Sequence, residues 1–534
     1  MTKPSLQQSQ IDSIKDPIGL WRHELGEDIL ENLLQRPIFH QVKGGVCRIL
    51  RTEQIVWGTD SSSVGVTRFR ADAPITLEKL KELGDGFCPR ACKAKDERVR
   101  RVRQKAEVFT PAWVCASMTE YLDEEWFGRK EIFIRRTDKG YEALNGDVDF
   151  GSNAKQWQRY VKSPRLEITC GEAPFIAMRY DAVTGAPIAI KDRVGILDRK
   201  LKVVTQFVQD PQEWLHWALK AVRSVYGYEW QGDSLFLARL NIVATFVEYF
   251  RDRFEDCVSY DAKAFNDTLK EVAQAVVLNF WQMNGVTGLF PYAKTHDVQG
   301  DLFSTDWNVK SAKSKSQQDD RGFDSPIYVC TWNSPKYVLY KDIRMKFDYV
   351  IGNPPYQEEI VGSNLKRPVY CDMMDAAYKI GTRVEMITPG RFLFRAGSTS
   401  DDWDTKMLSD PHLKVLEYSP DSKTYFQDVD IKGGVVITYR NSEADYEPIE
   451  VFIAFDELRG VYKKASPYCQ QGSIDDIIFG YLRWNKSTLF ADHPEIRESL
   501  SANVRDRKDM TSNAFEVYPI FQTWGGGDTS ALSA

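Results

Sequence analysis

The sequence lacks the segments that would place it in or across a membrane. No apolar run is long enough to span a bilayer, and the first ten residues are polar, without the apolar core of a signal peptide. The nine cysteines are scattered and odd in number, which fits reduced thiols better than a disulfide framework. We therefore expect a soluble, cytoplasmic protein with no membrane partner.

The chain also has no excess of positive charge. Its 70 Lys and Arg residues against 76 Asp and Glu residues give a formal net charge of −6. This balance creates no global field that attracts nucleic acid, so any contact with DNA must come from local patches. Residues 90–105 hold one basic run, which fits phosphate binding and a solvated helix face equally well.

Patterns typical of metal sites are also scarce. Cys88 and Cys92 form a C-x3-C pair, but no second pair follows at the spacing of a zinc finger. An isolated pair falls short of the four ligands of a structural zinc site, so we predict no metal.

Length and composition allow more than one domain. With 534 residues, of which 43% are hydrophobic, the chain can form about two to four domains with full-sized cores. Residues 1–104 predict a mixed α and β block to which the sequence assigns no role. The stretch at about 308–323 is polar and almost free of apolar residues, which we interpret as an insert.

Hydrophobic patterns predict further elements along the chain. Apolar residues at helical spacing predict helices at 11–36, 76–83, 112–122, 233–250, 262–282 and 373–380. Runs of β-branched and aromatic residues predict strands at 349–351, 384–389, 413–418 and 434–439.

The most informative stretch is residues 346–356, which read KFDYVIGNPPY. The apolar residues before Asn353 predict a short buried strand, and the strand must end there because Pro354 and Pro355 cannot donate hydrogen bonds to a sheet. In open α/β sheets, ligands bind at the carboxyl ends of strands. The Asn353 amide oxygen, the Pro354 carbonyl and the Tyr356 ring then offer two acceptors and a stacking face, which suit a planar amine. The alternative is a structural turn after a core strand.

Upstream, Thr110 and Pro111 predict the start of a helix. Thr110 is a favourable N-cap, and Pro111 fits the first helical position. The free backbone N–H groups of such a helix start would suit a carboxylate. As a bare helix cap, however, this pattern is common and proves little.

Two acidic residues follow short strand-like runs. Glu167 ends one run and Gly171 lies in the small-residue turn after it, so a carboxylate and bare backbone would face a cationic, amine-bearing ligand. Glu229 follows a Val and Tyr run, where a carboxylate can accept both ribose hydroxyls of a nucleoside. The turn is not a full G-x-G-x-x-G fingerprint, and an ordinary strand exit or a surface Glu is the alternative at each position.

In their order along the chain, these stretches resemble the amino-methylating DNA methyltransferases, over roughly residues 105–440. Asn353-Pro354-Pro355-Tyr356 matches the catalytic tetrapeptide of that family. The likeness is greatest to modification enzymes of type II restriction–modification systems. It implies a Rossmann-like α/β sheet with helices on both faces, and a C-terminal target-recognition region at 441–534.

The resemblance also implies roles for individual positions. The donor would be S-adenosylmethionine, and the acceptor would be N6 of an adenine flipped out of double-stranded DNA. A cognate restriction endonuclease is the implied partner. Tyr356 and Phe426 would stack on the flipped base. The donor-binding residues would be Phe109 and Thr110 at the helix start, Glu167, Thr169, Cys170 and Gly171 in the first cofactor motif, Glu229 at the ribose, and Asp301 at the adenine.

Two features depart from the family pattern. Glu172 and Ala173 stand where many relatives carry Ser-Gly, which leaves the backbone of the turn less open to a ligand. The spacing of Asp301 from the other motifs is long, and Asp306 competes for its role.

Three other functions stay open. Protein-glutamine and ribosomal-guanine methyltransferases also use Asn-Pro-Pro-Tyr, but they are compact, whereas this chain continues far beyond Tyr356. A bifunctional restriction–modification enzyme would need a nuclease core, and residues 1–106 show no convincing one. A non-catalytic DNA specificity subunit is at odds with the intact tetrapeptide.

Overall fold

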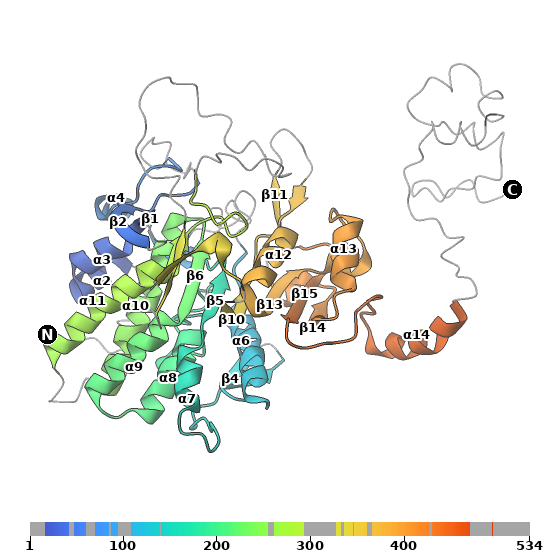
Figure 1. Cartoon of the computed structure of the whole chain (residues 1–534), viewed down its shortest axis with the longest axis horizontal. Coiled ribbons are helices and arrows are strands. Elements are labelled where there is room, and N and C mark those ends of the chain that lie inside the picture. Colours follow the sequence, from blue (N-terminus) through green and yellow to red (C-terminus); the bar gives the residue numbers. More distant parts are fainter. Residues whose placement is uncertain are drawn as a thin grey trace. The chain divides into compact units, whose positions relative to one another are not determined.

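A seven-stranded sheet organises the larger part of the chain (Figure 1). Its strands are β5 (Arg165–Ile168), β6 (Val225–Glu229), β7 (Phe280–Gln282), β10 (Phe347–Gly352), β13 (Gly381–Pro389), β14 (Leu413–Ser419) and β15 (Val435–Asn441). The order across the sheet is β14-β15-β13-β10-β5-β6-β7. Strands from β13 to β7 run parallel, whereas β15 is antiparallel to both of its neighbours.

The computed structural model divides the chain into two units, Met1–Phe452 and Ile453–Ala534. The described part of the second unit holds helix α14 (Asp456–Cys469), whereas the seven-stranded sheet belongs to the first unit. The described residues are 17–41, 47–59, 70–84, 87–93, 108–138, 140–254, 261–292, 327–332, 336–344, 346–359, 366–426, 430–469 and 494.

Helices cover both faces of the sheet. Side chains alternate along each strand, so on β10 Tyr349 and Ile351 join one apolar core while Val350 joins the other. The helices of the first core are α6 (Ala112–Phe127), α7 (Gln156–Lys162), α8 (Ile196–Phe207), α9 (Pro211–Arg223), α10 (Gly232–Phe254) and α11 (Ala262–Asn279). Those of the second core are α12 (Tyr370–Ile380) and α13 (Asp401–Leu408).

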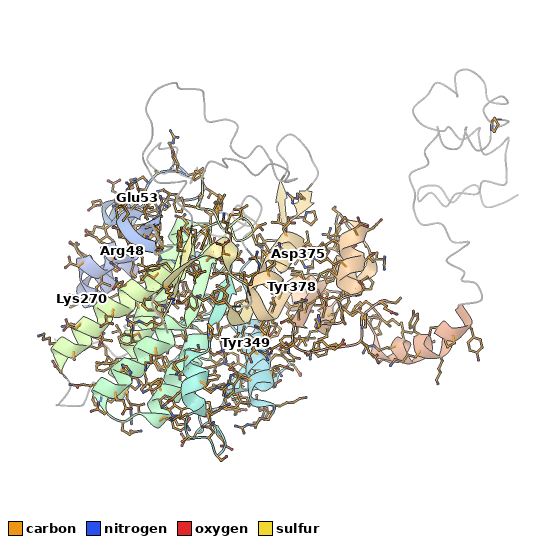
Figure 2. All side chains as sticks on the ribbon, viewed as in Figure 1. Arg48, Glu53, Lys270, Tyr349, Asp375 and Tyr378 are labelled. Atoms are coloured by element: carbon orange, nitrogen blue, oxygen red, sulfur yellow. The ribbon has the colours of Figure 1, made fainter. Side chains whose placement is uncertain are left out.

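The first core also contains buried charge. Tyr349, labelled in Figure 2, has the guanidinium groups of Arg165 and Arg383 at 4.9 and 5.5 Å from its ring. Arg165 is fully buried and forms an ion pair with Asp123 of α6 at 2.7 Å. A buried cation is tolerated when it is paired in this way. The architecture is that of a Rossmann-like methyltransferase sheet, and the predicted fold class is confirmed.

The chain also forms short hairpins and 3-10 turns outside the seven-stranded sheet. The hairpins are β1 (Gln35–Gln41) with β2 (Cys47–Gln54), β3 (Ile134–Thr137) with β4 (Gly140–Ala143), β8 (Tyr328–Thr331) with β9 (Lys336–Leu339), and β11 (Gln357–Glu359) with β12 (Lys366–Pro368). Single 3-10 turns are η4 (Arg90–Cys92), η5 (Ile190–Asp192), η6 (Tyr340–Asp342), η7 (Gly390–Phe394) and η8 (Ser422–Thr424).

The N-terminal block differs from its prediction. Residues 11–16 of the expected helix at 11–36 lie outside the described residues. The rest forms two helices, α2 (Pro17–Leu25) and α3 (Glu27–Leu33), and the start of β1. Gly26 separates them at φ +84°, a left-handed conformation that glycine adopts without steric cost. Helix α4 (Leu77–Leu83) confirms the prediction at 76–83, and Thr76 caps it by accepting from the Lys79 N–H.

Hydrogen bonds join the N-terminal block to the carboxyl ends of β6 and β7. The Gln282 side chain accepts from the Val56 N–H at 2.9 Å and donates to the Val56 carbonyl at 2.6 Å. The Trp230 indole donates to the Gly58 carbonyl at 2.9 Å, and the Gly232 N–H donates to the Trp57 carbonyl. Residues 55–59 therefore lie along the edge of the sheet at which Glu229 ends its strand.

Most other predicted elements are confirmed, with two exceptions. Helices cover 112–122, 233–250 and 373–380, and strands cover 349–351, 384–389, 413–418 and 435–439. The predicted helix at 262–282 is wrong at its end, because Phe280–Gln282 pair with β6 as a strand. The sequence predicts no helix or strand after residue 441, yet this region holds α14.

Two further expectations concern the polar insert and membrane-spanning segments. The polar insert at 308–323 lies outside the described residues. Within the described ranges, no helix has the length and apolar character needed to cross a membrane.

We expect Gly232→Ala to destabilise the fold. A Cβ at this position would lie 2.0 Å from the Val56 carbonyl oxygen, which Gln282 holds in place. Overpacking of this kind costs about 1–3 kcal/mol, and we expect a lower midpoint in thermal unfolding. Gly146→Ala is the matched control, because a Cβ there meets no atom within 4 Å. Equal midpoints for the two variants would contradict the close approach.

Candidate active site

The predicted site residues lie at the carboxyl ends of three adjacent parallel strands. β10 and β5 are neighbours, with Gly352 beside Ile168, and β5 pairs with β6 on its other side. From β5 the chain runs outward through β6 to β7, whereas from β10 it runs outward through β13. The β5–β10 boundary is thus a topological switch point, the place where open α/β sheets form a ligand crevice.

The Asn353 side chain is held in one orientation. Its Nδ2 donates to the Val108 carbonyl and to the Thr110 hydroxyl, each at 3.1 Å. Because a carbonyl can only accept, the amide nitrogen must face Val108, and the oxygen must point the other way. Asn353 Oδ1 is buried and has no hydrogen-bond partner among the described residues. The site therefore presents a fixed acceptor.

The predicted N-cap role of Thr110 is wrong. Helix α6 begins at Ala112 with Pro111 as its N-cap, and no side chain caps it. The Thr110 hydroxyl instead accepts from Asn353, and Asp181 Oδ2 accepts from the Ala112 N–H at 2.7 Å. A carboxylate of the chain itself thus occupies a position at the helix start that the sequence suggested for a ligand carboxylate.

Two aromatic rings lie beside the fixed acceptor. Tyr356 and Phe426 are both buried, and their ring centroids are 6.3 Å apart at an interplanar angle of 66°. Burial raises the pKa of Tyr356. The Asn353 amide offsets part of this rise without reaching hydrogen-bond geometry, so the Tyr356 hydroxyl is unpaired among the described residues. A planar ligand at Asn353 would lie against these rings.

The turn after β5 is conformationally strained. Thr169, Gly171 and Ala173 have φ angles of +46°, +52° and +62°, and two of the three are not glycine. Positive φ at such residues costs of order 1–3 kcal/mol and is typical of functional sites. The Thr169 hydroxyl donates to the Asn353 carbonyl at 3.1 Å, which connects this turn to the loop that begins at Asn353. The buried Cys170 forms part of the same turn.

Glu229 holds the turn from the neighbouring strand. Its Oε2 accepts from the Gly171 N–H at 2.9 Å, and its Oε1 accepts from the Gln231 N–H at 2.9 Å. The Gly171 N–H is therefore not open to a ligand, contrary to the expectation of bare backbone. An ionised carboxylate has about four lone-pair directions, so Glu229 is chemically suited to accept hydroxyl groups as well as N–H groups.

Glu167 is a buried carboxyl with spare hydrogen-bonding capacity. Only 2% of the residue is exposed, one oxygen has a long contact to the Phe175 N–H at 3.5 Å, and Oε2 is unpaired within the described part of the chain. Burial raises its pKa well above the ordinary value, and the Glu229 charge adds to the rise. A cationic ligand would satisfy this oxygen and restore the ionised form.

Glu172 anchors the turn to the N-terminal block, a role that the sequence did not reveal. Its Oε1 accepts from the Arg90 N–H at 2.8 Å, and its Oε2 accepts from the Tyr180 hydroxyl at 2.7 Å. In the sequence, Glu172 stands out only as a departure from Ser-Gly. Its partner Arg90 is 82 residues away, so no local pattern could have identified the contact.

Of the other residues predicted to bind the methyl donor, one lies at the site and two lie outside the described residues. Phe109 lies against the turn, since a Cβ added to Gly171 would be 3.6 Å from its ring. Asp301 and its competitor Asp306 lie outside the described residues. The structure thus brings together Phe109, Thr110, Glu167, Thr169, Cys170, Gly171, Glu229, Asn353, Pro354, Pro355, Tyr356 and Phe426 around one edge of the sheet.

Part of the chain around this site matches a known protein family. Residues 223–426 match the Eco57I restriction-modification methylase family. The matched stretch includes Glu229, the tetrapeptide at 353–356 and Phe426, but not the turn after β5. No curated protein matches the chain.

Two solved structures are similar to the chain at low identity. One is from the DrdV–DNA complex, with 14% identity, 78% of this chain and 34% of that chain covered, and a TM-score of 0.32. The other is a nuclease-deletion mutant of the Type ISP restriction-modification enzyme LlaGI in complex with a DNA substrate mimic, with 11% identity, coverage of 71% and 26%, and a TM-score of 0.30. This chain therefore spans about a third and a quarter of those two chains.

We expect Glu167→Gln to change the pH dependence of stability. Because the folded pKa of Glu167 is raised, the folded chain binds this proton more tightly than the unfolded chain, and wild-type stability falls as pH rises above about 4.5. Gln stays neutral at every pH, so the ligand-free variant should unfold at a higher temperature than the wild type near neutral pH. The difference should close toward pH 4.5.

The control for this measurement is Glu142→Gln, whose side chain is 62% exposed. This variant should follow the wild-type thermal midpoint across the pH range. A difference between Glu167→Gln and wild type that does not vary with pH would show that the effect comes from packing and not from ionisation.

Proposed function

We propose that this chain is a DNA methyltransferase that moves a methyl group from S-adenosylmethionine to N6 of an adenine. We further propose that it is the modification part of a restriction–modification system, with a cognate endonuclease as partner. The family match over residues 223–426 supports the methylase part of this proposal. Adenine as the acceptor rests on the tetrapeptide beginning at Asn353 and on the geometry around it.

The observation that carries the proposal is the fixed, unpaired Oδ1 of Asn353. The lone pair of an aromatic amine is delocalised into its ring, so the nitrogen is a poor nucleophile. Two acceptors on its hydrogens, Asn353 Oδ1 and the Pro354 carbonyl, would orient the amine and stabilise the positive charge that develops on it. The bonds to Val108 and Thr110 fix Oδ1 before substrate arrives, so no free energy is spent on orienting it.

The donor would bind at the carboxyl ends of β5 and β6, beside the β5 turn and Glu229. When bound, it supplies a methyl group on a sulfonium, which needs no further activation. Glu167 fits the donor's ammonium because its buried Oε2 is unpaired in the described structure. Glu229 would accept the ribose hydroxyls, and the strained turn at Thr169 would hold the donor's methionine end against the loop that begins at Asn353.

A base inside a duplex cannot reach Asn353, so the target must be flipped out. Tyr356 and Phe426 would then stack on its faces, and they must separate from their present edge contact to admit it. We assign residues 441–534 to target recognition, and residues 105–440 to methyl transfer.

Two variants test the fixed acceptor. At saturating donor, Asn353→Ala should bind the donor as the wild type does and lose at least about a hundredfold in single-turnover methyl transfer to DNA. Thr110→Val keeps the side-chain size but removes one acceptor that orients Asn353, and should lose about tenfold. The exposed Thr137→Val on β3 is the matched control. Unchanged transfer in Asn353→Ala would refute the catalytic assignment.

The acceptor class needs its own experiment. Wild-type chain with labelled donor is offered DNA, RNA and protein together, and we expect label on DNA adenine alone. Label on protein or RNA without DNA would replace the proposal by one of the other amino methyltransferase functions. A parallel incubation with Mg²⁺ and plasmid reports whether the chain also cuts DNA, and sequencing of modified adenines gives the recognition site.

A further inference from the structure

A guanidinium group from the N-terminal block lies beside the donor-side motif. Arg90, on η4, is 7% exposed, and its guanidinium carbon is 4.5 Å from the centroid of the Phe109 ring. Phe109 in turn packs on Gly171, within van der Waals range of the turn. A single aromatic ring therefore separates this buried charge from the turn after β5.

The Arg90 main chain is held in a fixed position. Its N–H donates to Glu172 Oε1, and the same carboxylate accepts from the Tyr180 hydroxyl. Asn241 of α10 donates to the Glu172 carbonyl at 2.9 Å and to the Tyr180 hydroxyl at 3.0 Å. The neighbours Cys88 and Pro89 are buried as well. The Arg90 main chain is thus held by the same network that contacts the turn.

Among the described residues, the groups that the sequence suggested beside the turn offer no partner for a ligand carboxylate. Glu167 and Glu229 are acidic, and the Ala112 N–H at the start of α6 is already bonded to Asp181. Among the described residues, Arg90 places its guanidinium over the ring of Phe109, a predicted donor-binding residue.

We propose that Arg90 binds the carboxylate of the donor's methionine moiety, while Glu167 binds its ammonium group. This inference rests on the proposed function, because it requires S-adenosylmethionine as the ligand. A zwitterionic end needs one acidic and one basic partner, and a guanidinium matches a carboxylate with two parallel hydrogen bonds. The N-terminal block then has a role: it supplies one wall of the donor site.

The test compares two ligands that differ only in the carboxylate. Calorimetry measures the Kd of S-adenosylmethionine and of decarboxylated S-adenosylmethionine for the full-length wild type and for Arg90→Gln. We expect the variant to bind S-adenosylmethionine on the order of tenfold to a hundredfold more weakly, and to bind the decarboxylated ligand as the wild type does. Lys93→Gln, three residues along the same segment, should leave both Kd values unchanged.

The possible outcomes distinguish an error in the role of Arg90 from an error in the proposed function. Equal weakening for both ligands, or no weakening for either, would overturn the role of Arg90 while leaving the proposed function intact. A wild type that binds neither ligand would refute the proposed function itself. If Arg90→Gln does not fold, Arg90→Lys replaces it, with a smaller loss again confined to the ligand that has the carboxylate. Equal affinity of the wild type for both ligands would also overturn the inference.

Discussion

The hydrogen bonds from the Asn353 amide to Val108 and Thr110 determine what the rest of the site can do. They join the end of β10 to the segment before α6, across 245 residues of sequence. A main-chain carbonyl cannot donate, so the amide has one compatible orientation, and its oxygen faces away from both partners. The bond from Thr169 to the Asn353 carbonyl adds the β5 turn to the same assembly. Acceptor, turn and helix start are therefore positioned together.

Several costs to stability are concentrated at this edge of the sheet. Thr169 and Ala173 hold positive φ angles, Glu167 is a buried carboxyl with an unpaired oxygen, and Asn353 Oδ1 is buried without a partner in the described structure. Each buried unpaired polar atom costs about 1–3 kcal/mol. The two apolar cores on either side of the sheet stabilise the chain enough to tolerate these costs. Their shared location indicates a ligand that would satisfy the unpaired atoms.

The N-terminal block connects to this edge at two places. Gln282 binds both main-chain groups of Val56 near the end of β7, and Glu172 binds the Arg90 N–H beside the β5 turn. Neither contact could be foreseen, because residues 1–104 carry no pattern associated with methyl transfer. The block and the sheet share one apolar core, so the block contributes to the site through packing as well as through these bonds.

The sequence by itself determined the strand that ends just before Asn353, because Pro354 and Pro355 both lack the N–H that a central strand needs. It determined most other elements through local periodicity. It could not determine the role of Thr110, whose hydroxyl can cap a helix or accept from a distant amide. It also missed the break at Gly26 and the strand at Phe280–Gln282. The role of Thr110 and the strand at Phe280–Gln282 depend on pairing between residues far apart in the chain, and only the tertiary structure decides which partner a polar group or a strand finds.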